Sequence, residues 1–183
     1  MKLFFKNKIL KFVLFPLLFI SCSSDLDFDQ VHDLKLEPVF VANLAYFNVP
    51  ASDFVNNGGE VTIFDVQDFD AFKDKFFRDN LVKAEFDVEI ENTIVRSFTV
   101  NLLLLNNNDE ILETINFNVP AYSGSSNVIK FPTEVFENQR LDLLKQTTKI
   151  GFVVKMQAGP PLDANSPGSI KLRSSATVYM EIE

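Results

Sequence analysis

The chain of 183 residues contains one cysteine, Cys22, and one histidine, His32, and both lie near its start. Nucleophilic catalysis needs a nucleophile beside a base, and a zinc site needs several cysteine or histidine ligands. Neither a Gly-x-Ser-x-Gly turn nor a glycine-rich phosphate loop occurs in the sequence. We therefore expect no catalytic residues, no cofactor and no metal of these kinds, and we interpret His32 as a solvated residue.

The other residues that could do chemistry form an acidic row of four carboxylates at every second position: Glu85, Asp87, Glu89 and Glu91. Apolar residues fill the positions between them, which is the alternation of a β-strand with one buried face. Carboxylates two positions apart on a strand lie about 6.5–7 Å from each other, and glycosidases use pairs at about 5–10 Å. Catalysis also needs a cleft and unequal environments that separate the two pKa values, and a regular exposed strand provides neither.

We therefore expect the acidic row to be a solvated face that is balanced by basic residues of neighbouring strands. The candidates for this balance are Lys149, Lys155, Lys171 and Arg173. The alternative is a face that binds a cation or a positively charged partner. Four aspartates between Asp25 and Asp33 have the spacing of a calcium loop, but Gln30 and Leu36 replace its glycine and its last glutamate. We predict no metal there.

The start of the chain has the pattern of a secretory signal. Four lysines and no acidic residue lie in the first eleven positions, and an almost wholly apolar run follows at residues 12–20. A basic segment, a short apolar segment and a small residue before the cut form this pattern. The run is much shorter than the roughly 20 residues that span a bilayer, so we expect no permanent transmembrane helix.

The run ends in Leu18-Phe19-Ile20-Ser21-Cys22, which resembles the lipobox of bacterial lipoproteins. The resemblance implies cleavage between Ser21 and Cys22 and attachment of acyl chains such as palmitate to Cys22. Phe19 stands where lipoboxes usually have an aliphatic residue. Two or three acyl chains, at about 0.8 kcal/mol per buried methylene, give a stable anchor, which one chain does not. The alternative is an ordinary signal peptide followed by a free cysteine.

The next residues, Ser23-Ser24-Asp25-Leu26-Asp27-Phe28-Asp29, resemble the surface-export signal of lipoproteins from the Bacteroidetes, especially flavobacteria. The domain that follows is similar to a flavobacterial lipoprotein family without an assigned activity, which supplies no site residues. The resemblance implies an outer membrane lipoprotein and leaves open whether it faces the periplasm or the exterior.

The part of the chain after the signal is strongly acidic. The signal contains four of the 17 basic residues, so 13 remain against 25 acidic residues, a net charge of −12. Such a surface repels nucleic acid, whose binding depends on lysines and arginines that neutralise phosphates. With Cys22 lipidated no thiol remains, so we expect no disulfide.

From residue 35 onward the sequence predicts one β-rich domain. Strands are expected near residues 37–49, 61–64, 85–91, 98–104, 111–119, 128–131, 149–157 and 170–182. Turn signals separate these stretches, and the expected helices are short. The sequence therefore predicts an antiparallel β-sandwich, Ig-like in general architecture, of about seven or eight strands with one or two short helices.

Two short helices are expected beside the strands. Phe69, Phe72 and Phe76 recur at helical spacing and predict an amphipathic helix over residues 69–79, with Asp68 capping its first turn. The stretch 102–105 is apolar on both faces of its strand, so we expect another element to cover the outer face, with this helix as the candidate. The second helix is expected around Leu141 and Leu144.

These observations divide the chain into a signal peptide (1–21), a lipidated acidic tether (22–34) and a β-sandwich (35–183). The leading hypothesis is a cell-envelope lipoprotein that is not an enzyme and serves structure, assembly or protein binding. The alternative is a glycan-binding accessory lipoprotein, and an enzyme of unrecognised type is the least favoured. Its partners are then the membrane, through the lipid, and an envelope protein or glycan. The chain lacks tryptophan, and Tyr122, beside a Gly-Ser loop, is the candidate residue of a binding loop.

Overall fold

The computed structural model describes residues 35–55, 58–125 and 128–182. The predictions for the signal peptide, Ser21, Cys22, the acidic tether and His32 lie outside the described residues. Residues 36–182 form one folded unit, and the description below concerns that unit.

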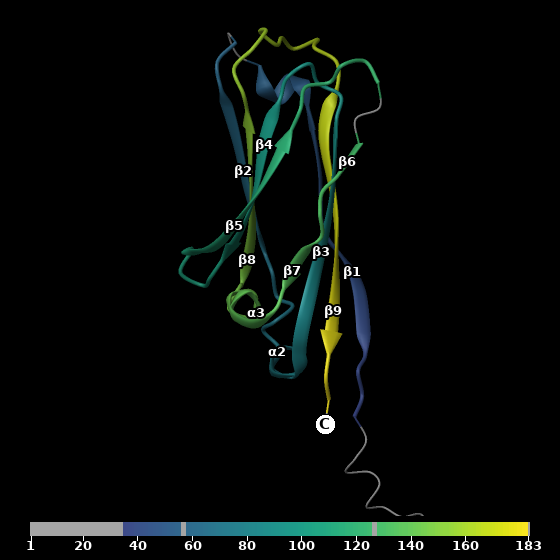
Figure 1. Cartoon of the computed structure of the whole chain (residues 1–183). Helices are drawn as coiled ribbons and strands as arrows, with labels where there is room; N and C mark the ends of the chain where they lie inside the picture. Colours follow the sequence, from purple (N-terminus) through teal and green to yellow (C-terminus); the bar gives the residue numbers. More distant parts are fainter. Residues whose placement is uncertain (1–34, 56–57, 126–127, 183) are drawn as a thin grey trace, which may run out of the picture. The chain divides into compact units, whose positions relative to one another are not determined.

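Two antiparallel sheets face each other in this unit (Figure 1). The strands of the first sheet are β1 (Val39–Pro50), β3 (Leu81–Asn92), β6 (Val128–Lys130), β7 (Glu134–Phe136) and β9 (Ser169–Met180). Their order is β1-β9-β3-β6, and β7 also pairs with β3. The strands of the second sheet, in the order β2-β8-β4-β5, are β2 (Val61–Asp68), β8 (Lys149–Met156), β4 (Phe98–Leu105) and β5 (Ile111–Val119).

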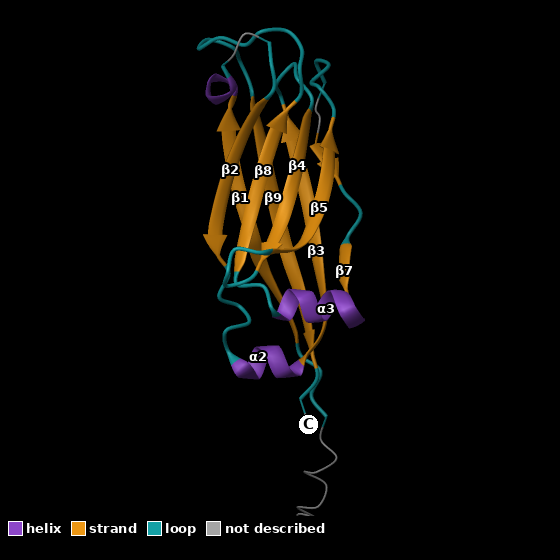
Figure 2. Cartoon of the chain, turned by 90° about the vertical axis from the view of Figure 1, so that its left-hand side faces the viewer, coloured by secondary structure: helices purple, strands orange, loops and turns teal. Residues whose placement is uncertain are grey.

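The predicted antiparallel β-sandwich is confirmed. The described residues contain nine strands rather than seven or eight, because β7 is only three residues long and such a strand shows no alternation in the sequence. The described helical segments are the 3₁₀ turn η2 (Ala51–Phe54) and the helices α2 (Lys75–Asn80) and α3 (Asn138–Lys145) (Figure 2). None of the described helices has the length and apolar character that a membrane crossing requires.

The core lies between the sheets and is built from alternate residues of the strands. On β3, Phe86, Val88 and Ile90 are buried, whereas the acidic row occupies the opposite, outer face. Phenylalanines fill much of this interior, as the pairs Phe54–Phe98 and Phe117–Phe131 illustrate, with ring centroids 5.0 and 4.8 Å apart. Such edge-to-face pairs add to the stabilisation that apolar burial provides.

The helix α3 ties the two sheets together. Leu141 and Leu144 are buried, which confirms the expected short helix at this place. Arg140 on its outer side donates to Glu113 of β5 (Nε to Oε1, 2.8 Å) and to Glu134 of β7 (Nη2 to Oε2, 2.9 Å). One guanidinium therefore joins a strand of each sheet.

The prediction of a helix over residues 69–79, capped by Asp68, is wrong in both its bounds and its capping residue. Asp68 is the last residue of β2, and the backbone N–H of Phe69 donates to the carbonyl of Thr148 at 2.8 Å, so the chain is still extended there. The helix α2 begins only after Asp74, whose carboxylate accepts a hydrogen bond of 2.7 Å from an N–H of the first turn. The phenylalanine spacing therefore spans a turn and a short helix.

The suggestion that this helix covers the outer face of the stretch 102–105 is also wrong. On the outer face of β4, Leu103 and Leu105 are buried, and the residues around them come from strands and from the hairpin after β4. A Cβ at Gly151 of β8 would lie 3.2 Å from Leu105 and 3.4 Å from Val66. Because this glycine has no side chain, its neighbours close over β8 and shield one another. The helix α2 packs elsewhere, on Phe40 of β1.

The sandwich has two distinct ends. At the base, Leu36 and Ile182 exchange backbone hydrogen bonds of 3.0 and 2.9 Å, and Glu181 donates to the carbonyl of Asn80 at the end of α2. The apex, at the opposite end of the strands, is formed by the apical loops, which we define as residues 51–55, 58–60, 93–97, 120–125 and 157–168 (Figures 1 and 2).

Candidate functional site

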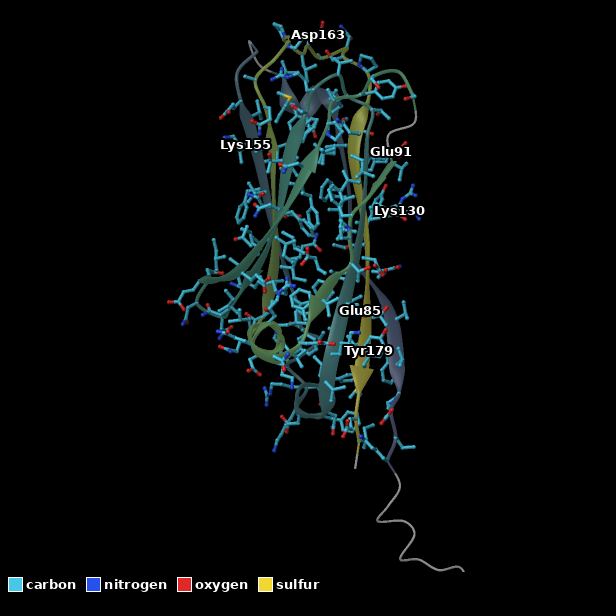
Figure 3. The ribbon with its side chains drawn as sticks, in the orientation of Figure 1. Glu85, Glu91, Lys130, Lys155, Asp163 and Tyr179 are labelled. Carbon is cyan, nitrogen blue, oxygen red and sulfur yellow. The ribbon has the colours of Figure 1, made fainter. Side chains whose placement is uncertain are left out.

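The acidic row lies on the outer face of β3, as the alternation predicts, and Figure 3 labels Glu85 and Glu91 at its two ends. Each of the four carboxylates has a partner. Thr133 Oγ1 donates to Asp87 Oδ1 at 2.6 Å, and Lys171 Nζ donates to Glu91 Oε2 at 3.4 Å. The described residues contain no group of three or more carboxylate, histidine or cysteine side chains that could hold a metal ion.

Within the acidic row, Glu85 is contacted by two side chains, those of Lys83 and Tyr179. Lys83 Nζ lies 2.7 Å from Glu85 Oε1, and Tyr179 Oη donates to Glu85 Oε2 at 2.9 Å. The hydrogen bond from Lys83, followed by that from Tyr179, lowers the pKa of Glu85 below its ordinary value of 4.5. The same contacts raise the pKa of Lys83, and the carboxylate raises that of Tyr179.

Glu89 is neutralised in a similar way. Lys130 of the edge strand β6 approaches Glu89 Oε1 to 2.7 Å, and this hydrogen bond lowers the pKa of Glu89. Arg173 of β9 lies opposite Glu89 in the strand register and contributes in the same direction.

The predicted balancing residues are therefore half correct. Lys171 and Arg173 lie on β9 beside the row. Lys149 and Lys155 lie on β8 of the other sheet, where they pair with Asp109 (2.5 Å) and Glu60 (2.8 Å), so their assignment to the row is wrong. Lys83, Lys130 and Tyr179 take that place. Lys83 lies on β3 itself, two positions before Glu85, so the alternation could have identified it. Lys130 and Tyr179 lie on β6 and β9, and the sequence contains no local signal for the strand register that brings them there.

The apical loops are held by a buried guanidinium that the sequence interpretation missed. Arg96 is 2% exposed. It donates to backbone carbonyls of two other apical loops, 58–60 and 157–168. Its Nε donates to Gln157 O at 3.0 Å and its Nη1 to Pro160 O at 2.6 Å. Its Nη2 donates to Gly59 O at 3.1 Å and also to Gln157 O. Among residues 35–55, 58–125 and 128–182, no carboxylate forms a salt bridge with it.

The loops are shaped to admit this guanidinium. A Cβ at Gly159 would lie 2.8 Å from Arg96 Nε, so only glycine leaves room for the close approach. The signal that could have identified Arg96 is its place in the series Ile94, Arg96, Phe98. These residues occupy every second position of the chain, and all three are buried.

Asn92, fully buried at the end of β3, fixes the neighbouring loop. Its Nδ2 donates to the carbonyls of Arg96 (2.8 Å) and Pro120 (2.7 Å), and its Oδ1 accepts from Ile94 N at 2.9 Å. The amide therefore joins the loop after β3 to the loop after β5.

Tyr122, the predicted binding-loop residue, lies in the apical loops. Its side chain is half-buried, and its backbone N–H donates to Ile94 O at 2.9 Å. Asp163, at the tip of another apical loop, accepts a hydrogen bond of 2.8 Å from Asn165 N in a self-contained turn (Figure 3). The acidic row and Tyr122 therefore belong to different parts of the surface: the outer face of a sheet and the apex.

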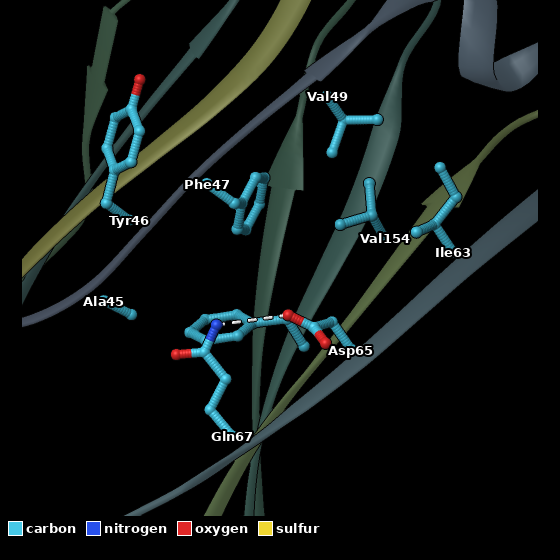
Figure 4. A pocket seen from close by; sticks show the side chains of 9 residues that line it. Ala45, Tyr46, Phe47, Val49, Ile63, Asp65, Gln67 and Val154 are labelled. Atoms are coloured by element: carbon cyan, nitrogen blue, oxygen red, sulfur yellow. Dashed lines mark hydrogen bonds between the residues drawn. The ribbon is translucent and has the colours of Figure 1, made fainter.

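A small pocket opens between the edge strands β1 and β2 (Figure 4). It measures about 100 Å³, and Phe47 and Phe152 meet in it with ring centroids 5.6 Å apart. Gln67 Nε2 donates to Asp65 Oδ2 at its rim, at 3.3 Å. Ligand pockets usually measure about 300–1,000 Å³, so this one has room for a side chain rather than a drug-sized molecule.

The sequence matches no family model and no curated protein. Among solved structures, the chain is similar to VP2 of the infectious bursal disease virus subviral particle, with 12% identity over 79% of this chain and 32% of VP2 and a TM-score of 0.44. A protein of Parabacteroides distasonis that is described as secreted shares 10% identity over 65% of this chain and 38% of that protein, also with a TM-score of 0.44.

Tailspike protein 4 of bacteriophage CBA120 shares 8% identity over 80% of this chain and 19% of its own, with a TM-score of 0.40. The chain thus spans well under half the length of each of these proteins. Similarity at this level carries no argument about function.

The contacts of Arg96 predict a large effect of its replacement on stability. Arg96→Met leaves the carbonyls of Gln157, Pro160 and Gly59 without the donors of the guanidinium, and we expect a loss of about 3 kcal/mol in the free energy of unfolding. Arg96→Lys keeps the charge but not the planar guanidinium that reaches several carbonyls at once, and its free energy of unfolding should fall by about 2 kcal/mol. Urea unfolding measures both, with the exposed Arg173→Lys as the control. Equal stability of all three variants would contradict the role of the guanidinium.

The contacts of Glu85 predict a pH effect. Because the folded pKa is lowered, the contribution of Glu85 to stability is present above its ordinary value of 4.5 and is lost as the pH falls through the lowered folded value. Lys83→Met should move the pKa of Glu85 back toward 4.5, which carboxyl NMR titration measures. Lys75→Met, which removes the partner of Asp79 on α2, is the matched control and should leave Glu85 unchanged.

Proposed function

We propose that the protein is a lipoprotein of the cell envelope, held in the outer membrane by acyl chains on Cys22. Its sandwich then serves as a structural, assembly or protein-binding module without catalytic activity of its own. The observation that carries this proposal is the segment Leu18–Cys22, in which the only cysteine of the chain follows a small residue at the end of a short apolar run.

The positions of the two ends of the sandwich support a display role. The chain that follows Cys22 enters the folded unit at Leu36, which lies at the base. The apical loops lie at the other end of strands such as β9, whose twelve residues extend over about 40 Å. An anchor before Leu36 would leave the apical loops as the part of the domain that is most accessible to a partner.

The apical loops are also the part best prepared for binding. Arg96 and Asn92 hold several of these loops through hydrogen bonds of buried side chains, so little conformational entropy is lost when a partner binds them. The carboxylates of the acidic row, in contrast, already have partners within the domain. We therefore propose that the partner contacts the apical loops, including Tyr122.

The state of the carboxylates supports a role without catalysis. A general acid of the glycosidase type needs a raised pKa, whereas hydrogen bonds from lysines lower the pKa of Glu85 and Glu89.

The anchor predicts the outcome of metabolic labelling. Cells that express the protein and receive an alkyne analogue of palmitate should incorporate the label into the wild type, and Cys22→Ala should abolish incorporation. Ser23→Ala, one position further along the chain, is the matched control and should be labelled like the wild type. Continued labelling of Cys22→Ala would refute lipidation at this residue.

The apical contact predicts the outcome of crosslinking on intact cells. Benzoylphenylalanine placed at Tyr122 or at Asn165 should yield a crosslinked partner protein. The same residue at Phe64, which is 59% exposed on the outer face of the second sheet, should not. Crosslinks from Phe64 alone would move the contact away from the apex, and retention on polysaccharide without any crosslinked protein would favour the glycan-binding alternative.

A further inference from the structure

Four large apolar side chains are exposed together at the base: Leu36 (51%), Phe40 (46%), Phe76 (49%) and Phe77 (38%). We call them the basal patch. Full burial of one such side chain stabilises a protein by about 1.5–3 kcal/mol, and the folded domain leaves much of this gain unused. Exposed large apolar residues that gather at one place indicate a contact surface.

The strand register and the ring contacts connect the four members of the basal patch. Leu36 pairs with Ile182 and Phe40 with Val178, so the register runs unbroken between them. Positions four apart on an extended strand lie on the same face. The ring of Phe77 meets that of Phe40 edge-on at 6.1 Å, and Phe76 meets Phe77 at 5.9 Å. The patch therefore continues from β1 onto α2.

The core does not account for this patch. Further along β1, Leu44, Phe47 and Val49 pack against the core, whereas Phe40 does not belong to it. The helix α2 is fixed at the base by the Asp74 cap and by the hydrogen bond from Glu181 N to Asn80 O (2.8 Å). Two phenylalanines are thus held at the surface on a short helix that buries none of its residues.

The course of the chain indicates what could cover the patch. Leu36 is itself a member, and thirteen residues separate it from Cys22. Fourteen peptide steps span at most about 50 Å, so a bilayer that holds the acyl chains of Cys22 is always within reach of the base. A tether of this length raises the effective concentration of the lipid surface at the patch, and a weak contact then suffices.

The charges around the patch suit a lipid surface. The segment 70–80, which carries both phenylalanines of α2, has three acidic and three basic residues, and Lys73–Asp70 and Lys75–Asp79 are paired within it. The chain after the signal has a net charge of −12, which anionic lipids would repel. The part of the base that carries Phe76 and Phe77 therefore offers apolar side chains with locally balanced charge.

We propose that the basal patch docks on the lipid surface that holds the Cys22 anchor, with Phe76 and Phe77 inserted at the boundary between headgroups and acyl chains. This inference rests on the proposed lipid anchor. Docking would hold the domain upright on the membrane and keep the apical loops at a fixed height. Amphipathic surfaces with phenylalanine and leucine insert to about 5–10 Å at this boundary.

Because the chain contains no tryptophan, a single introduced tryptophan reports its own surroundings. Phe76→Trp places the reporter in the patch, and Phe64→Trp is the control, since Phe64 is similarly exposed on the second sheet. Both proteins are purified from cells that express the full chain and placed in vesicles of phosphatidylethanolamine and phosphatidylcholine with a minority of lipid with brominated acyl chains. Phe76→Trp should shift its emission to shorter wavelength and lose most of its intensity to bromine, whereas Phe64→Trp should keep both.

The possible failures can be told apart. If the vesicles float with both proteins and Phe76→Trp is not quenched, docking is wrong and the anchor stands. If neither protein floats with the vesicles, the anchor fails and docking fails with it. A blue shift that depends on protein concentration and not on bromine would mean that a second copy covers the patch, which also overturns docking. Leu36→Trp is the second reporter if Phe76→Trp does not fold, as judged by circular dichroism.

Discussion

The apex of this domain depends on one buried guanidinium. A charge in the interior is costly unless its donors are satisfied, and Arg96 meets that requirement with carbonyl oxygens of two loops other than its own. An arginine is suited to this task because its planar fork reaches several acceptors at once. The loops around Arg96 therefore cannot move independently without removing acceptors from a buried charge. Arg140 supplies a comparable link near the base.

The sequence was sufficient to predict the architecture because the alternation of β3 and the turn at Asn106 are local features. Asn106 Oδ1 accepts from the backbone N–H groups of Asn108 (2.9 Å) and Glu110 (3.0 Å), which closes the hairpin as its composition indicates. The helix α2 was misplaced because its phenylalanine spacing does not reveal that Phe69 still bonds to Thr148, far along the chain. Local patterns predict elements, and distant pairing decides where they begin.

The candidate site was predictable to the same extent. Exposure of the acidic row follows from the alternation, but its counter-charges depend on which strands are neighbours. Lys149 and Lys155 have suitable spacing and lie on the wrong sheet, whereas Lys130 comes from a strand of three residues. Arg96 was missed because a single arginine in a loop looks like a surface residue, even though Ile94 and Phe98 on both sides of it are apolar. The outer face and the apex thus differ in what the sequence alone can reveal about them.

The position of β9 has a consequence for how the domain is made. Although it is the last strand of the described chain, it lies inside its sheet, between β1 and β3, and it is the strand to which β1 is paired. The residues of β1 are therefore synthesised more than a hundred positions before the residues of β9 with which they pair. Such distant pairing slows folding. A polypeptide that must cross a membrane before it folds would benefit from this delay, because β1 has no strand to pair with until synthesis has passed Met180.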